Sequence, residues 1–166
     1  MFDDDDAAML WLGIVNSFVF DWVVRRYITN TINFFILENL PFPSIDQDGI
    51  LAQSIIDRVR RITEMEDGDD GWSRDELWAY AHERANLDAL VFEAYGLNAS
   101  EMDTILADFP LVDQVNAQLT GGLKPTMLLV RAHVVGDKGA IDEAKEACMQ
   151  GAMPYVPNEH MRSMLR

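Results

Sequence analysis

The sequence contains little cysteine and little positive charge. Cys148 is the single cysteine among 166 residues, which excludes an internal disulfide framework and a cysteine-only zinc site. An intracellular, cytoplasmic location is therefore the expectation. The 13 basic residues stand against 28 acidic residues, which gives a net charge of −15. Because phosphates attract a positive surface, we do not expect this chain to bind nucleic acid without help from another chain.

The sequence also lacks a clean apolar run of membrane-spanning length. Its most apolar stretch, residues 7–24, follows four aspartates, Asp3 to Asp6, instead of the basic leader of a signal peptide. Asn16, Ser17 and Asp21 interrupt this stretch, whereas a span needs about 20 residues nearly free of charge. These polar residues recur at helical spacing. The pattern predicts one buried amphipathic helix and no membrane contact.

Helical periodicity and capping signals dominate the rest of the chain. Ser73 with Glu76, and Asn98 with Glu101, have the spacing of capping boxes. Pro125 occupies a favoured first helical position. The further helices that we predict cover residues 48–65, 73–95, 98–109, 125–135, 140–150 and a short segment from Asn158. The predicted fold class is therefore mainly α, with about six helices and a minor β component.

The β component rests on the stretch "TNTINFFILENLPFP", residues 29–43. Residues 31–37 place mostly apolar side chains on both faces of an extended segment, and Pro41 and Pro43 then end it. We predict a buried strand near residues 31–37. One strand needs neighbours for its hydrogen bonds, so it pairs with unrecognised strands within residues 107–135, with another chain, or with a second copy of this chain.

Composition divides the chain into three parts. Residues 1–66 form a helix, strand and helix segment. Residues 67–72 are an acidic linker rich in glycine. Residues 73–166 form a C-terminal helical segment.

Three separated segments resemble one known family. They are "LGIVNSFVFDWVVRRYITNTINFFILENLPFP" (residues 12–43), "RANLDALVFEAYGLNASEMDTILADFP" (84–110) and, more loosely, "GLKPTMLLVRAH" (122–133). In order and spacing they are similar to the C-terminal region of large adenine-specific DNA methyltransferases of the restriction type IIG and BREX kind. In that family this region holds the end of the target-recognition domain and its helical support. The resemblance implies that residues 1–66 are the recognition-like part.

The catalytic motifs of that family are missing from this sequence. The glycine-rich turn for S-adenosylmethionine is absent, and "AMPYVP" (residues 152–157) has Met153 where the adenine-binding Asn-Pro-Pro-Tyr motif has asparagine. Asp113, Glu143 and Lys145 mimic the spacing of a nuclease metal site, but the last two lie in a helical pattern. We therefore assign no catalytic residue, metal or cofactor to this chain alone, and expect S-adenosylmethionine in a catalytic partner.

Two small basic groups are the candidates for DNA contact. Arginine and asparagine can read base edges, and threonine often meets phosphates. The candidates are Arg25, Arg26, Thr29, Asn30, Thr31, Arg58, Arg60 and Arg61. The alternative for the first group is a helix C-terminus whose dipole favours positive charge. The alternative for the second is a solvated helix face.

The sequence therefore predicts a non-catalytic DNA-recognition and scaffold piece of a DNA methyltransferase or restriction-modification system of antiphage defence. It would reach DNA through a complex with a methyltransferase or restriction subunit. The alternative is an acidic helical interaction module, or a DNA mimic that occupies a partner's basic cleft. An autonomous helical domain with neither role is the third reading.

Overall fold

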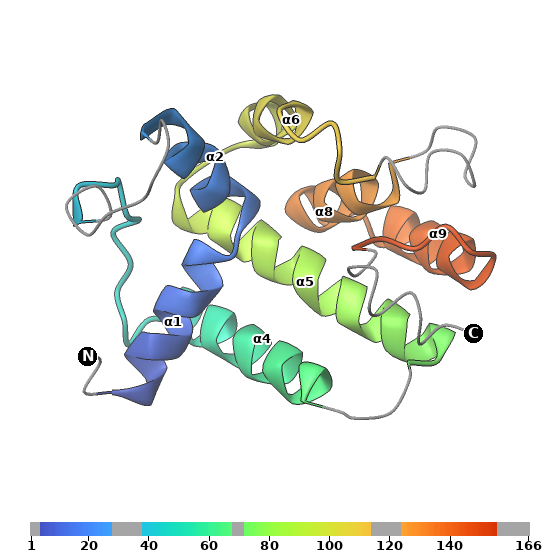
Figure 1. The fold of residues 1–166 in the computed structure, drawn as a ribbon, viewed down its shortest axis with the longest axis horizontal. Coiled ribbons are helices and arrows are strands. Elements are labelled where there is room, and N and C mark those ends of the chain that lie inside the picture. Colours follow the sequence, from blue (N-terminus) through green and yellow to red (C-terminus); the bar gives the residue numbers. More distant parts are fainter. Residues whose placement is uncertain (1–3, 28–37, 68–71, 114–123, 156–166) are drawn as a thin grey trace.

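The computed structural model describes residues 4–27, 38–67, 72–113 and 124–155 of the chain. Over these ranges the regular elements are all α-helices (Figure 1), which confirms the mainly α class. The helices are α1 (Asp5–Val15), α2 (Phe18–Tyr27), α4 (Ile50–Glu66), α5 (Arg74–Ala94), α6 (Ala99–Ala107), α8 (Pro125–Val135) and α9 (Lys138–Met149).

The predicted strand at residues 31–37 and the helix predicted from Asn158 lie outside the described residues. Further strands were an alternative within residues 107–135. In the described parts of that window, residues 107–113 are the end of α6 and turns, and residues 124–135 are α8 with its cap. The partner for a strand at 31–37 is therefore not found in those parts.

Helix α5 is the central element of the fold. It runs through the middle of the molecule and packs against α4 and α1 on one side and against α8 and α9 on the other. Helix α2 packs near the C-terminal end of α5, and α6 packs against α2 and α8 (Figure 1). Helix α5 thus contacts most of the other described helices, and it is also the longest of them.

The helix ends follow the capping signals of the sequence. Ser73 and Glu76 form the predicted capping box at the start of α5, and Asn98 with Glu101 forms a second one at the start of α6. Gly96, just after α5, adopts a left-handed φ of 68°, a conformation that other residues avoid. Local signals therefore set the boundaries of α5 and α6.

The prediction of one long N-terminal helix over residues 7–24 is wrong. Helix α1 ends at Val15 and α2 begins at Phe18, and the two axes are bent by 70°. The polar residues Asn16 and Ser17, which we read as part of a helical stripe, form the break. None of the described helices is by itself long and apolar enough to cross a membrane, although α1 and α2 taken together reach the length and composition.

One hydrophobic core joins the parts of the chain on either side of residues 67–72. It includes Ile14 and Val19 from the first helices, Ile55 from α4, Phe92 from α5 and Leu129 from α8, all nearly inaccessible to solvent. On α4, Ile55, Val59 and Ile62 recur at spacings of four and three residues and are buried in this core.

Helices α1 and α4 cross closely because Gly13 has no side chain. A Cβ atom at Gly13 would lie 2.8 Å from the Cγ2 atoms of both Ile55 and Val59. Ordinary carbon contacts are much longer, so a larger residue requires the two helices to separate.

We expect Gly13→Ala to lower the free energy of unfolding by about 1–3 kcal/mol, because overpacking forces the α1–α4 crossing apart. Urea denaturation measures the change. Gly139→Ala in α9 is the matched control, since its Cβ would meet only Asp137 Oδ1, at 3.4 Å. Equal stability of the two variants would contradict the close crossing.

Candidate functional site

The break between α1 and α2 is built around Ser17. Its hydroxyl donates to the carbonyl of Ile14 at 2.7 Å and accepts from the N–H of Phe20 at 3.2 Å. The same side chain thus satisfies a carbonyl at the end of α1 and an N–H in the first turn of α2. Serine is well suited to cap helices in this way, because its short side chain reaches the neighbouring backbone groups.

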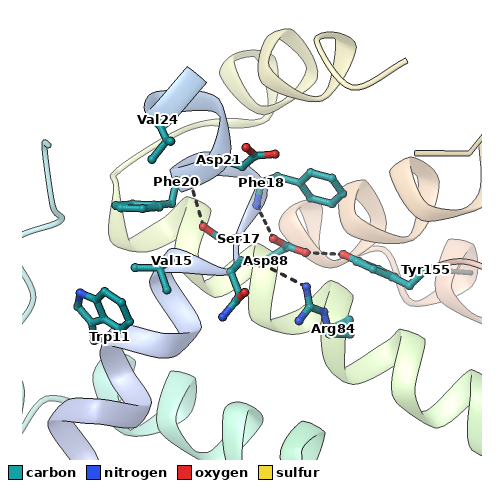
Figure 2. A pocket seen from close by; sticks show the side chains of 11 residues that line it. Trp11, Val15, Ser17, Phe18, Phe20, Asp21, Val24, Arg84, Asp88 and Tyr155 are labelled. Carbon is teal, nitrogen blue, oxygen red and sulfur yellow. Dashed lines mark hydrogen bonds between the residues drawn. The ribbon is translucent and has the colours of Figure 1, made fainter. Parts of the chain in front are cut away.

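Two charged residues of α5, one turn apart, hold the break in place. Asp88 Oδ1 accepts from the backbone N–H of Phe18 at 2.9 Å, and Arg84 Nη2 donates to the carbonyl of Asn16 at 3.2 Å. The negative group therefore faces the start of α2, and the positive group faces the end of α1. Both placements match the helix dipoles. Figure 2 shows Asp88 between the Phe18 backbone and Tyr155.

Tyr155 completes the coordination of Asp88. Its hydroxyl donates to Asp88 Oδ2 at 2.5 Å, so both carboxylate oxygens are engaged. Burial raises the pKa of the Asp88 carboxyl, and Arg84, the Tyr155 hydroxyl and the Phe18 N–H act against that rise. Burial also raises the pKa of Tyr155 well above its ordinary value, so the hydroxyl keeps its proton and remains a donor.

A second buried carboxylate organises the start of α8. Asp113 accepts from the N–H groups of Thr126 and Met127 at 3.1 and 3.3 Å. The Thr126 hydroxyl in turn accepts from the N–H of Tyr155 at 2.7 Å. We call Ser17, Arg84, Asp88, Asp113, Thr126 and Tyr155 the polar centre. Through these residues the first helices, α5, the start of α8 and the segment after α9 meet in one place.

A pocket of about 510 Å³ opens beside the polar centre, over the break. Its apolar side consists of Trp11, Val15 and Phe20, and its polar side includes Arg84 and Asp88 (Figure 2). Each carboxylate oxygen of Asp88 accepts one hydrogen bond, and burial raises the pKa of both Asp88 and Tyr155. The apolar side of the pocket suits an apolar or aromatic group, which would lie next to this buried carboxyl.

The predicted DNA-contacting arginines of α2 already have acidic partners. Arg25 donates through Nε and Nη2 to Asp21 at 2.9 and 2.7 Å. Arg26 donates to Asp108 at 2.9 Å, and its guanidinium lies 3.2 Å from the centre of the Trp22 ring. Exposed pairs of this kind stabilise the fold little. Exchanging these carboxylate partners of Arg25 and Arg26 for a phosphate therefore loses little folding stability.

The predicted arginines of α4 divide between two faces. Arg58 and Arg61 share Glu83 of α5, at 2.7 and 3.5 Å. The Arg58 side chain is only 25% exposed, so it is part of the α4–α5 packing. Arg60 instead reaches Asp5 and Asp6 at the start of α1, at 3.2 and 2.5 Å.

The structure therefore brings together Arg25 with Arg26 on α2, and Arg58 with Arg61 on α4, but it separates these pairs from each other and from Arg60. Thr29, Asn30 and Thr31 lie outside the described residues. Helix α2 and helix α4 occupy different regions of the molecule (Figure 1). The described candidates form local ion pairs rather than one continuous basic surface.

Sequence reasoning missed the polar centre. It named neither Arg84 nor Asp88 as a candidate, and it considered Tyr155 only within a failed adenine-binding motif. The available signal was a charged pair, Arg84 and Asp88, spaced four residues apart among buried apolar positions of α5. A buried pair at that spacing indicates that some other backbone or side chain must satisfy it.

Two histidines meet where α5 packs against α8. The rings of His82 and His133 lie 4.7 Å apart, and His133 Nε2 has no hydrogen-bond partner among the described residues. Burial, with the neighbouring His82 and Arg58, lowers the pKa of His133 to about 4. Within the described ranges, no three histidine, cysteine or acidic side chains are grouped so as to hold a metal ion.

Asp88→Ala is expected to lower the free energy of unfolding by about 2–4 kcal/mol, because the Phe18 N–H and the Tyr155 hydroxyl lose their buried acceptor and the Arg84 guanidinium loses a nearby negative charge. Asp88→Asn keeps one acceptor oxygen and should lose less. Denaturant unfolding measures both, with exposed Glu93→Gln on the same helix as the control. An Asp88→Ala protein as stable as the control would show that the polar centre does not hold the break.

Stability should fall as the pH drops from 7 toward 4, partly because of His133. The folded pKa lies near 4 and the ordinary value is 6.5, so between these values the unfolded chain binds the proton and the folded chain does not. This difference amounts to about 1–3 kcal/mol by pH 4. His133→Phe should flatten this part of the pH dependence in urea unfolding. An unchanged slope, or an NMR titration of His133 near 6.5, would contradict the assignment.

Comparisons of the chain with protein-family models, with curated proteins and with solved structures give no match.

Proposed function

We propose that this chain is a non-catalytic DNA-recognition and scaffold piece of an adenine-specific DNA methyltransferase or restriction-modification system of phage defence. It acts in the cytoplasm together with a partner that binds S-adenosylmethionine and transfers the methyl group. Its own role is to support the reading of DNA by that complex.

The observation that carries this proposal is the convergence of the three resembling segments on the polar centre. The first segment supplies Ser17 and the Phe18 N–H, the second supplies Arg84 and Asp88, and the third supplies Thr126. The first two segments hydrogen-bond to each other, through Phe18 with Asp88 and through Arg84 with Asn16. The third joins them through Tyr155, which bonds both Thr126 and Asp88. The three resembling segments are thus parts of one folded unit, as a common origin requires.

The need for a partner follows from charge. The net charge is −15, and each described candidate arginine is paired with a carboxylate. The protein alone therefore repels a phosphate backbone over most of its surface. A partner with a basic cleft would supply the attraction, and Arg25 and Arg26 would add local contacts once the DNA is held close.

The same charge pattern favours a second candidate function, an acidic interaction module or DNA mimic derived from such an enzyme. In that case the carboxylate surface itself would enter the partner's basic cleft. The two functions predict opposite changes in the partner's affinity for DNA. A recognition piece raises the partner's affinity for its DNA site, whereas a mimic lowers the partner's affinity for every DNA.

The test is to purify the chain together with the methyltransferase protein from the same organism. DNA binding is then measured for the complex and for each protein alone. We expect the isolated chain not to bind DNA at about 150 mM salt. We expect the complex to bind its methylation site more tightly than the partner alone. Competition with all DNA would support the mimic instead, and unchanged binding would overturn both functions.

In that complex, Arg25→Ala combined with Arg26→Ala should weaken DNA binding about tenfold and reduce its salt dependence, because phosphate contacts release counterions. Arg74→Ala is the control, as this exposed arginine at the start of α5 is not a DNA candidate. Electrophoretic mobility shift at several salt concentrations gives both quantities. Equal behaviour of the two variants would remove α2 from the DNA surface.

A further inference from the structure

A second hollow lies between α8 and α9, two helices that carry none of the candidate residues for DNA. It has a volume of about 320 Å³. Small side chains make the depression, and two large aliphatic side chains, Leu128 and Val135, stand at its edge with 51% and 46% of their surface exposed. The small residues are Ala132, Ala140, Ala144 and Ala147. We call this surface the α8–α9 groove.

The charges around the α8–α9 groove are unequal. Arg131 lines it, but its guanidinium already donates to Asp103. Asp137 and Glu143 also line it, and both are exposed. Glu143 forms no ion pair with any residue in the described part of the chain. The uncompensated charge at the rim is therefore negative, as is the net charge of the whole protein.

The apolar lining and the negative rim of the α8–α9 groove together favour one kind of partner over others. An acidic rim repels the phosphates of nucleic acids and of anionic lipid surfaces. The apolar lining offers few hydrogen-bonding groups for a polar small molecule. Two packed helices with alanines between them can instead receive the large side chains of a third helix, because such side chains fill the hollow while the helix backbone stays outside.

We propose that the α8–α9 groove is a docking site for one amphipathic helix of a protein partner. The helix carries large apolar side chains at positions i, i+3 or i+4, and i+7, and basic residues beside them. Leu128 and Val135 contact its apolar face, and Glu143 and Asp137 pair with its basic flank. Docking at the α8–α9 groove does not depend on a role of the chain in DNA modification.

A synthetic peptide provides the probe. A fluorescent helix of about 14 residues, made of leucine at the spacing above and lysine elsewhere, should bind the full chain with a dissociation constant on the order of micromolar. It should also gain helical circular dichroism on binding. A peptide with the same leucines and glutamate in place of lysine should bind at least about tenfold more weakly.

Substitutions in the chain separate docking from simple attraction to an acidic protein. Leu128→Ser combined with Val135→Ser should weaken binding of the lysine peptide about tenfold, whereas Ile50→Ser should not. Ile50 is 89% exposed but lies on α4, away from the α8–α9 groove. Glu143→Lys should weaken binding more than Asp142→Lys, its neighbour outside the lining. Equal effects of groove and control substitutions would overturn the proposal, because the peptide would then be adsorbing to net charge.

Discussion

The contact on which the fold depends is the one between the Asp88 carboxylate and the backbone N–H of Phe18. It fixes the start of α2 onto α5, while Arg84 fixes the end of α1 one turn earlier on the same helix. Without these two groups, the break at Asn16 and Ser17 would leave polar backbone groups inside an apolar environment. The 70° bend that they stabilise brings α2 across the end of α5, beside α6. A buried carboxylate adds little stability compared with apolar packing, but its removal leaves two buried donors unpaired, and so it favours one arrangement of the helices.

Much of this architecture could be predicted from local sequence, because local rules set it. The capping boxes at Ser73 and Asn98 and the proline at 125 each act over three or four residues, and each lies where the pattern predicted it. The bend between α1 and α2 could not be predicted in this way. Its cause is Asp88, which is 70 residues away from Phe18 along the chain, and no periodicity within residues 7–24 carries that information.

The candidate site was also only partly predictable. Sequence pattern identified the arginines but not their partners, since Asp108 and Glu83 lie 82 and 25 residues from the arginines that they bind. A local cluster of positive charge therefore became a set of ion pairs on folding. The polar centre was missed for a related reason. Tyr155, judged only as part of a motif, acquires its role when it reaches Asp88, and Arg84 acquires its role when it reaches the carbonyl of Asn16.

The long separation between Asp88 and its two donors has a consequence for synthesis of the protein in the cell. Residues 7–24 leave the ribosome well before Asp88, by about 4–14 seconds at roughly 5–20 residues per second for the 70 residues between. Tyr155 follows after another 67 residues. During that interval the apolar surfaces of α1 and α2 have neither α5 to cover them nor a carboxylate to hold their bend. The nascent chain thus presents a chaperone substrate at residues 7–24, and a pause in translation before residue 88 would prolong its exposure to aggregation.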